Sequence, residues 1–154
     1  MKAVFSGTFD PITVGHLDII KRASAMFDEV CVLVCSNSEK KSSFSIEKRT
    51  EMVKSATNDI RNIKIDTCCG LLAEYTEKNG YDVIIRGIRD SGDISYEMML
   101  ATINRSLRNH PETIFIPSKP EHSYISSSYV RDMIKYGESL DGIVPDSVIK
   151  IISK

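Results

Sequence analysis

The sequence has almost no net charge, because 20 lysines and arginines are balanced by 21 aspartates and glutamates. This balance of -1 at pH 7 argues against a general nucleic-acid binder, which would show a basic excess or stripe. No apolar stretch approaches the ~20 residues that a membrane-spanning helix needs. The N-terminal segment contains no extended apolar region, so we expect no secretory signal peptide and a cytoplasmic protein.

Cysteine is also scarce, and its four positions lack the spacing of a zinc site. Cys31 and Cys35 fall within an apolar run typical of a buried strand, and nothing near the adjacent Cys68 and Cys69 indicates a lowered pKa. We therefore expect reduced thiols rather than metal ligands or disulfides. Acidic clusters with metal-cage spacing are missing too, so any Mg²⁺ would be carried on substrate phosphates with waters.

Two common nucleotide-binding motifs are absent. The sequence has neither a Walker-type loop nor a dinucleotide fingerprint, which disfavours kinase and dehydrogenase functions.

The 154 residues show an alternation of strand-like and helix-like segments without an internal repeat or linker. This pattern predicts one α/β domain over residues 1–154, with a doubly wound parallel sheet of the Rossmann type and C-terminal helices. The expected strands are Ala3–Ser6, Glu29–Ser36, Ile63–Thr67, Asp82–Arg86 and Thr113–Pro117, and the expected helices are Gly15–Met26, Ile46–Thr57, Leu71–Lys78 and Ser91–Leu107. Two short helices should follow, with Gly137 ending the first and Pro145 beginning the second.

The run from Ser6 to His16 is the most informative stretch of the chain. It links the first expected strand to the first helix, where free backbone N–H groups and the helix dipole favour phosphate. Thr8 adds a hydroxyl and His16 an imidazole, and Gly15 lets a ligand approach the backbone. The loop predicts nucleotide chemistry.

Three further loops should meet this one, because ligands of open α/β sheets bind beyond the carboxyl ends of the strands. They contain Lys40, then Arg86 and Arg89, then the serine run Ser126–Ser128 at a helix start. These groups suit a polyphosphate, with arginine as a bidentate fork and lysine as a mobile charge.

Each of these residues also has a structural interpretation. Thr8 and His16 could be turn and helix-start residues, and Lys40 a solvated loop residue. The two arginines could form surface ion pairs with Asp82, Asp90 or Asp93, and the serines could simply cap a helix. Three apolar residues of the fourth helix are interpreted as packing residues rather than as a ligand box: Tyr96, Met98 and Met99.

The motifs of this chain resemble a known family. The matching segments are Gly7–Pro11, Thr13–His16, Ser38–Lys41, Ile84–Arg89, Tyr96–Met98, Asn104–Arg105 and Ile125–Arg131. The Thr-x-Gly-His element is similar to the signature of the nucleotidyltransferase superfamily. The whole set, in this order and spacing, resembles the bacterial phosphopantetheine adenylyltransferases.

The resemblance implies adenylyl transfer from ATP to 4′-phosphopantetheine, giving dephospho-coenzyme A and pyrophosphate by direct attack, with Mg²⁺ carried on ATP. It implies that His16 stabilises the transition state and that Thr8 holds the acceptor phosphate close to the α-phosphate. Lys40 would bridge charge between the two substrates, and Arg89 would support catalysis. Arg86 and Leu72 would bind phosphopantetheine. The implied ATP contacts are Thr8, Phe9, His16, Gly87, Ile88, Arg89, Glu97, His122, Ser123, Tyr124, Ile125, Ser126, Ser127 and Ser128. The family also implies a homohexamer. From the balanced charge and the lack of long apolar runs, we expect no nucleic-acid or membrane partner.

Three positions depart from the family pattern. Ser6 stands where proline is usual, Ser95 where an acidic residue is usual, and His122 where a large aromatic side chain is common. Two alternatives remain open. One is another transferase of the superfamily, acting on a pyridine mononucleotide or transferring cytidylyl to a small alcohol phosphate. The other is a catalytically silent nucleotide-binding module.

Overall fold

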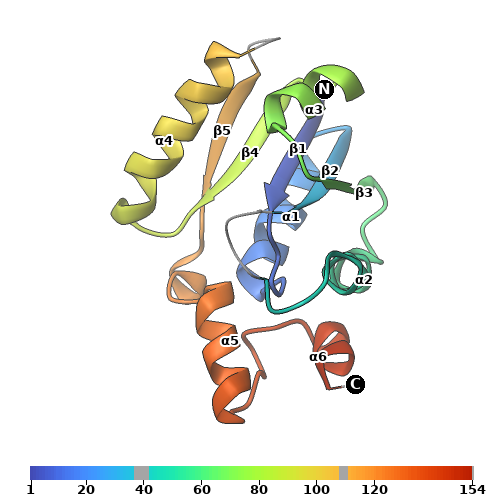
Figure 1. Cartoon of the computed structure of the whole chain (residues 1–154), viewed down its shortest axis with the longest axis vertical. Helices are drawn as coiled ribbons and strands as arrows, with labels where there is room; N and C mark the ends of the chain where they lie inside the picture. The colour runs from blue at the N-terminus through green and yellow to red at the C-terminus, as the bar shows by residue number, and fades with distance from the viewer. Residues whose placement is uncertain (37–41, 108–110, 154) are drawn as a thin grey trace.

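The computed structural model describes residues 1–36, 42–107 and 111–153. Its centre is a five-stranded parallel sheet in the order β3-β2-β1-β4-β5 (Figure 1). This arrangement confirms the expected α/β class with a doubly wound parallel sheet. The strands are β1 (Lys2–Gly7), β2 (Glu29–Cys35), β3 (Ile63–Cys68), β4 (Val83–Ile88) and β5 (Glu112–Pro117).

Helices follow the strands on both faces of the sheet. They are α1 (Val14–Met26), α2 (Ile46–Thr57), α3 (Leu72–Asn79), α4 (Ser91–Ser106), the short 3₁₀ helix η1 (Pro120–His122), α5 (Ser127–Tyr136) and α6 (Asp146–Ile152). The nine strands and helices expected before the C-terminal tail are confirmed, with boundaries that differ by at most two residues. Gly137 ends α5 in a left-handed conformation as expected, whereas Pro145 caps α6 rather than opening it. The sequence pattern did not predict η1.

The apolar runs of the strands divide between two cores. Val30, Val32 and Val34 of β2 face one cluster, which also holds buried residues of α1, α2, α5 and α6. Cys31 and Leu33 face the opposite way, into a smaller cluster against α3. Because helices cover both faces, the five consecutive residues from Val30 to Val34 are all buried, which explains the lack of polar alternation in this strand.

The strand order places β1 beside β4, the point where the winding of the sheet reverses. Their pairing runs only from Ala3 opposite Val83 to Phe5 opposite Ile85. The outer pairing of β4 with β5 continues three residues further, to Ile88 opposite Pro117. The two central strands therefore separate at their carboxyl ends, where ligands of such sheets bind.

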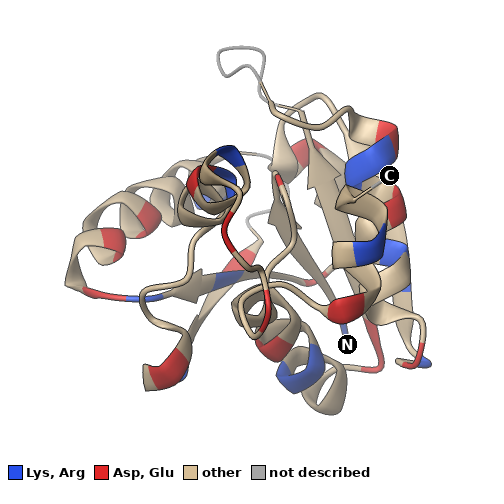
Figure 2. Cartoon of the chain, turned by 90° about the horizontal axis from the view of Figure 1, so that it is seen from below, with Lys and Arg blue, Asp and Glu red and all other residues tan. Residues whose placement is uncertain are grey.

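The surface carries mixed charges, and α4 exposes several large apolar side chains. Figure 2 shows basic and acidic residues interspersed along the helices and loops rather than segregated. On α4, Tyr96, Met98 and Met99 are at least half exposed, so their interpretation as packing residues is wrong within a single chain. None of the described helices combines the length and apolarity needed to cross a membrane.

Candidate active site

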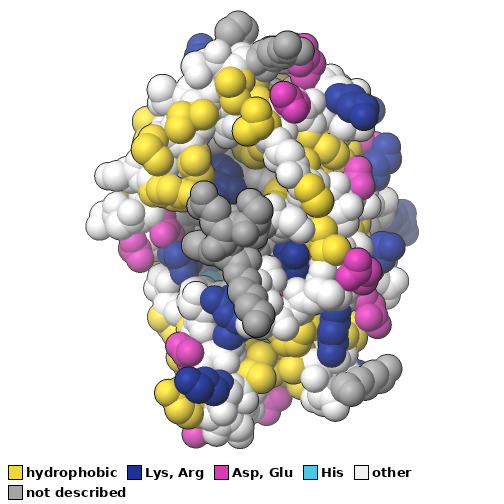
Figure 3. Space-filling view, in the orientation of Figure 1, with side chains coloured by type: hydrophobic (Ala, Val, Ile, Leu, Met, Phe, Trp, Pro, Cys, Tyr) yellow, Lys and Arg dark blue, Asp and Glu magenta, His cyan; other side chains and the backbone are white. Residues whose placement is uncertain are grey.

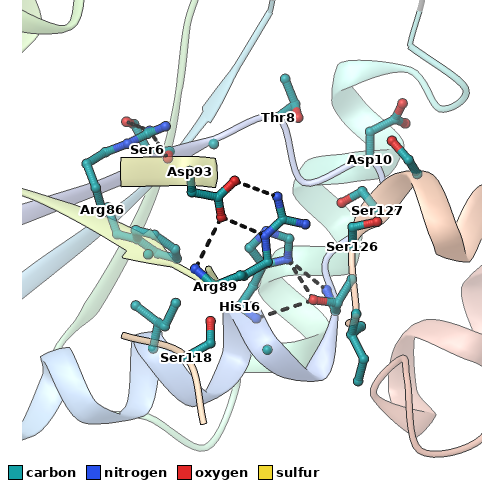
Figure 4. A pocket seen from close by; sticks show the side chains of 18 of the residues that line it. Ser6, Thr8, Asp10, His16, Arg86, Arg89, Asp93, Ser118, Ser126 and Ser127 are labelled. Carbon is teal, nitrogen blue, oxygen red and sulfur yellow. Dashed lines mark hydrogen bonds and ion pairs between the residues drawn. The ribbon is translucent and has the colours of Figure 1, made fainter. Parts of the chain in front are cut away.

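A cavity of about 770 Å³ opens where β1 and β4 separate (Figure 4). Its size falls within the range of pockets that enclose small-molecule ligands. Eleven of the residues expected at the site line it: Thr8, His16, Arg86, Gly87, Arg89, Glu97, His122, Ile125, Ser126, Ser127 and Ser128. Three of the four expected loops are thus brought together. Lys40, in the remaining loop, lies outside the described residues.

Five of the expected residues are not part of this lining. Phe9 is buried in the larger core, and Leu72 packs against the smaller one. Ile88 ends β4, while Ser123 and Tyr124 lie between η1 and α5.

The turn after β1 has a conformation that determines which side chains face the cavity. Phe9 adopts a positive φ of 46°, which is rare for a side chain of this size. Its ring lies so close to Gly7 that a Cβ there would come within 3.0 Å of it. The ring also meets the His16 imidazole edge to face, at 5.2 Å between centroids. Phe9 therefore supports His16 from the core side, while Thr8 faces the cavity.

His16 is oriented by the start of its own helix. Thr13 caps α1, and its side chain accepts the backbone N–H of His16. In return, Nδ1 of His16 accepts the backbone N–H of Thr13 at 3.1 Å and lies 2.9 Å from the Thr13 hydroxyl. Because Nδ1 serves as an acceptor, the ring proton is assigned to Nε2. The imidazole thus presents one N–H donor to the cavity.

The surroundings of His16 keep the ring neutral. Burial lowers its pKa to about 4, and the positive charges of Arg89 and Arg86 act in the same direction. At neutral pH the side chain is therefore a hydrogen-bond donor without a charge. Such a fixed donor can stabilise negative charge that develops on a phosphoryl oxygen.

Arg86 is held firmly at the end of β4. Its Nε and Nη2 donate to the two carboxylate oxygens of Glu97 at 2.6 and 2.7 Å. Its Nη1 donates to the carbonyl and the hydroxyl of Ser6 at 2.9 and 3.1 Å. These bonds use four of the five guanidinium N–H groups. The fifth can donate to a ligand while the ion pair between Arg86 and Glu97 stays intact.

Arg89 has more donors available. Its Nε and Nη2 both bond to Asp93 at 3.0 Å, and these contacts raise the pKa of Arg89 (Figure 4). The same pairing holds the pKa of Asp93 below its usual range. Both N–H groups of Nη1 remain without a partner among the described residues, so they can bind an anion.

The start of α5 completes the opposite wall. The Ser126 hydroxyl accepts the backbone N–H of Tyr129 at 3.0 Å, and the Ser127 hydroxyl donates to the Pro11 carbonyl at 2.8 Å. The second bond joins this helix to the turn after β1. Free N–H groups at a helix start, next to arginines, are typical of a phosphate site.

The described residues also form a recognisable family domain. A family model described as cytidylyltransferase-like matches residues 4–133. The chain belongs to this family. Membership supports nucleotidyl transfer as its reaction class, and the match covers all residues that line the cavity.

Among the described residues, the cavity supplies hydrogen-bond donors rather than a set of metal ligands. Within the described parts of the chain, no group of three His, Cys, Asp or Glu side chains is placed to hold a metal ion. The nearest carboxylates are occupied, since Glu97 and Asp93 bind arginines. This donor set fits a cation that is bound mainly by substrate phosphates.

Several lining residues of this site were not among the expected site residues: Ser6, Asp10, Asp93, Ser118 and Arg131. Arg131 donates to the Asp10 carbonyl at 2.8 Å and to the Ser128 hydroxyl at 2.9 Å. Its place within the matching Ile125–Arg131 segment, one turn after the serine run, was a usable signal. Ser6 gave no signal of this kind, because its role depends on a contact 80 residues away.

Proposed function

We propose that the protein transfers the adenylyl group of ATP to 4′-phosphopantetheine, forming dephospho-coenzyme A and pyrophosphate. The observation that carries this proposal is the convergence of Arg86, Arg89, His16 and the serine start of α5 on one cavity. The two arginines extend from the same strand end, and Gly87 lies between them. They offer two separate anion sites, as a reaction between two phosphorylated substrates requires.

The chemistry follows from what these residues can supply. A phosphate oxygen of the acceptor attacks the α-phosphorus of ATP, and the bond from that phosphorus to the bridging oxygen of pyrophosphate breaks. The acceptor phosphate is already a nucleophile at neutral pH, so no activated serine or cysteine is needed. Catalysis then consists of positioning and charge stabilisation. The Nε2–H of His16 would donate to an α-phosphoryl oxygen, where charge grows in the transition state.

The two substrates would occupy different walls of the cavity. Arg89, with its free Nη1, and the start of α5 would bind the ATP phosphates, while the segment from His122 to Ile125 would border the nucleoside. Gly87 and Ile88 would contact ATP through their backbone, and Glu97 through the edge of its carboxylate. Phe9 would contact ATP through its backbone, while its ring supports the His16 imidazole from the core side.

The acceptor would bind across the carboxyl ends of β1, β2 and β4. Thr8 and Arg86 would hold its phosphate, and Lys40 would contribute charge between the two substrates. Leu72 packs against the same small core as Cys35, a residue of the cavity lining. The pantetheine arm would therefore leave the phosphate site past Cys35 toward Leu72.

We further propose that Mg²⁺ accompanies ATP and that the reaction takes place in the cytoplasm. When bound, the ion would neutralise phosphate charge and improve the pyrophosphate leaving group. The cysteines are free thiols. Such thiols suit a reducing compartment.

We also propose a homo-oligomer, built on the exposed apolar side of α4. Figure 3 shows apolar side chains gathered on the surface over this helix. The exposed residues are Ile94, Tyr96, Met98, Met99 and Ile103, with Ile114 of the neighbouring β5. Contiguous apolar surface of this kind marks association sites. Replacing Met99 by Glu should shift the sedimentation coefficient to that of a smaller species, and an unchanged value would place the interface elsewhere.

A pyrophosphate-release assay tests the reaction. The wild type is supplied with ATP or CTP and with a panel of acceptors that includes 4′-phosphopantetheine, nicotinate mononucleotide and glycerol 3-phosphate. We expect release only with ATP and 4′-phosphopantetheine. Turnover with a mononucleotide or with CTP would assign the protein to another branch of the family. Binding of ATP without turnover of any acceptor would identify a silent module.

A further inference from the structure

Arg49 is a buried cation that the proposed reaction does not use. It lies on the inner side of α2 and is 2% exposed. No carboxylate pairs with it among the residues that the structure describes. Instead, Nη1 donates to the carbonyl oxygens of Thr8 at 2.6 Å and Cys35 at 2.9 Å, and Nε donates to that of Phe44 at 3.2 Å.

The three carbonyls belong to three different segments of the chain. Thr8 lies in the turn after β1, Cys35 ends β2, and Phe44 precedes α2. Thr8 and Cys35 line the cavity. Arg49 therefore lies directly behind the cavity wall, and its hydrogen bonds join the turn after β1, the end of β2 and the segment before α2.

Asp10 supports the same frame from the other side. Its Oδ1 accepts the backbone N–H of Phe44 at 2.9 Å, and its Oδ2 accepts that of Ser43 at 2.8 Å. The backbone of Phe44 is thus bonded on both sides, through its N–H to Asp10 and through its C=O to Arg49. The carboxylate binds donors and the guanidinium binds acceptors, so each side chain performs a task that the other cannot.

Core packing alone does not explain an arginine at this position. The neighbouring inner positions of α2 hold Met52 and Val53, both fully buried. A buried cation is costly unless its N–H groups are satisfied. Its benefit lies in geometry, because a planar guanidinium can bind several carbonyls in fixed directions, whereas an ammonium is a point charge.

We propose that Arg49 is a positioning residue for nucleotidyl transfer, holding the turn that carries Thr8 in register with the end of β2 and the start of α2. The inference rests on the proposed function only in its assignment of Thr8 to the acceptor phosphate. Arg49 acts through the Thr8 backbone and touches neither substrate. A displacement of about 1 Å in a positioning group can cost up to about 10²-fold in rate.

Three variants test this role in the full-length protein. Arg49→Lys keeps the charge and removes the fork, Arg49→Ala removes both, and Val53→Ala is the matched control, a buried substitution on the same helix. Each variant is assayed for kcat and KM with ATP and the acceptor, at a temperature where circular dichroism shows it to be folded. Methylguanidinium and methylammonium are then added separately to Arg49→Ala at millimolar concentration.

We expect kcat to fall by about 10- to 100-fold in Arg49→Lys, with KM for ATP changed less than about threefold. Val53→Ala should lower Tm and leave kcat unchanged. Methylguanidinium should restore part of the activity of Arg49→Ala, and methylammonium should not. Equal kcat in Arg49→Lys and the control, or the lack of any guanidinium rescue, would leave Arg49 with a purely structural role.

The outcome for the acceptor is separate from the outcome for Arg49. If the wild type turns over a different acceptor of the panel, the phosphopantetheine assignment fails and the Arg49 comparison is made with that acceptor. If the wild type turns over none, both proposals are overturned.

Discussion

His16 provides the sharpest test of the site, because its charge state follows from two independent features. Its Nδ1 accepts the Thr13 N–H, and burial beside two arginines lowers its pKa to about 4. At pH 5.5, a histidine with the usual pKa of 6.5 would be ~90% protonated, whereas His16 should be ~3% protonated.

The same difference makes a prediction for stability. The unfolded chain takes up this proton as the pH falls through 6.5, while the folded chain takes it up only near pH 4. The unfolded state is therefore favoured progressively as the pH falls through this window. Between pH 7 and pH 5, the wild type should lose about 2 kcal/mol more unfolding free energy than His16→Gln, which has no proton to gain.

Two measurements check this reasoning. Long-range proton–nitrogen NMR spectra report the tautomer and titration of each of the three histidines, and His16→Gln assigns the signal. Urea unfolding of both proteins at pH 7 and pH 5 gives the free-energy difference. A titration midpoint near 6.5, a proton on Nδ1, or parallel loss of stability in the two proteins would refute the neutral donor.

Four further substitutions give distinct results. His16→Ala should lower kcat by about 10²–10³-fold while changing ATP affinity little, as a calorimetric titration beside the assay would show. Glu97→Gln should lower the unfolding free energy by about 1–3 kcal/mol, because Arg86 loses its charged partner. Added pyrophosphate should recover part of the lost Tm by binding to Arg86 in place of the carboxylate. Gly87→Ala places a Cβ 2.4 Å from Cδ1 of Ile19, so this substitution should lower Tm. The double variant Gly87→Ala with Ile19→Val should recover most of the lost Tm, because valine lacks the Cδ1 atom. Ser126→Ala removes the cap of α5 and should cost about 1 kcal/mol, or roughly 2–4 °C in Tm, in thermal unfolding. An unchanged Tm in either of the last two single variants would contradict the contacts described here.

The strands and helices were predictable because local pattern and tertiary environment agree. Long apolar runs, such as that of β2, form buried strands. Glycines that predict a helix end, such as Gly137, do end a helix in the structure. The convergence of loops was predictable for a general reason, since all parallel strands end at one edge of the sheet. The pairing of the arginines was only partly foreseen: Asp93 was among the suggested partners, and Glu97 was not.

Other features depend on contacts that local patterns do not encode. Phe9 belongs to a motif assigned to ATP, yet its positive φ turns the ring into the core. Arg49 did leave a trace, because it occupies a helical position in line with buried Val53 and Met52. A charged residue at an apolar position of a helix indicates a buried polar contact, but the sequence does not tell which carbonyls it meets. The exposure of Tyr96 and Met99 could not be predicted from an apolar pattern, which is the same for a core and for an interface.

The unequal size of the two cores has a consequence for how the molecule opens. One face of the sheet is covered by residues from α1, α2, α5 and α6, whereas on the other the described residues include only five buried ones, beside α3. Local opening is easiest where few apolar contacts resist it. Amide hydrogens of α3 and α4 should therefore exchange with solvent sooner than those of α1. This ordering gives the sheet a rigid face and a compliant face, and β4, which carries Arg86, contributes buried residues to both, Val83 and Ile85 to the first and Ile84 to the second.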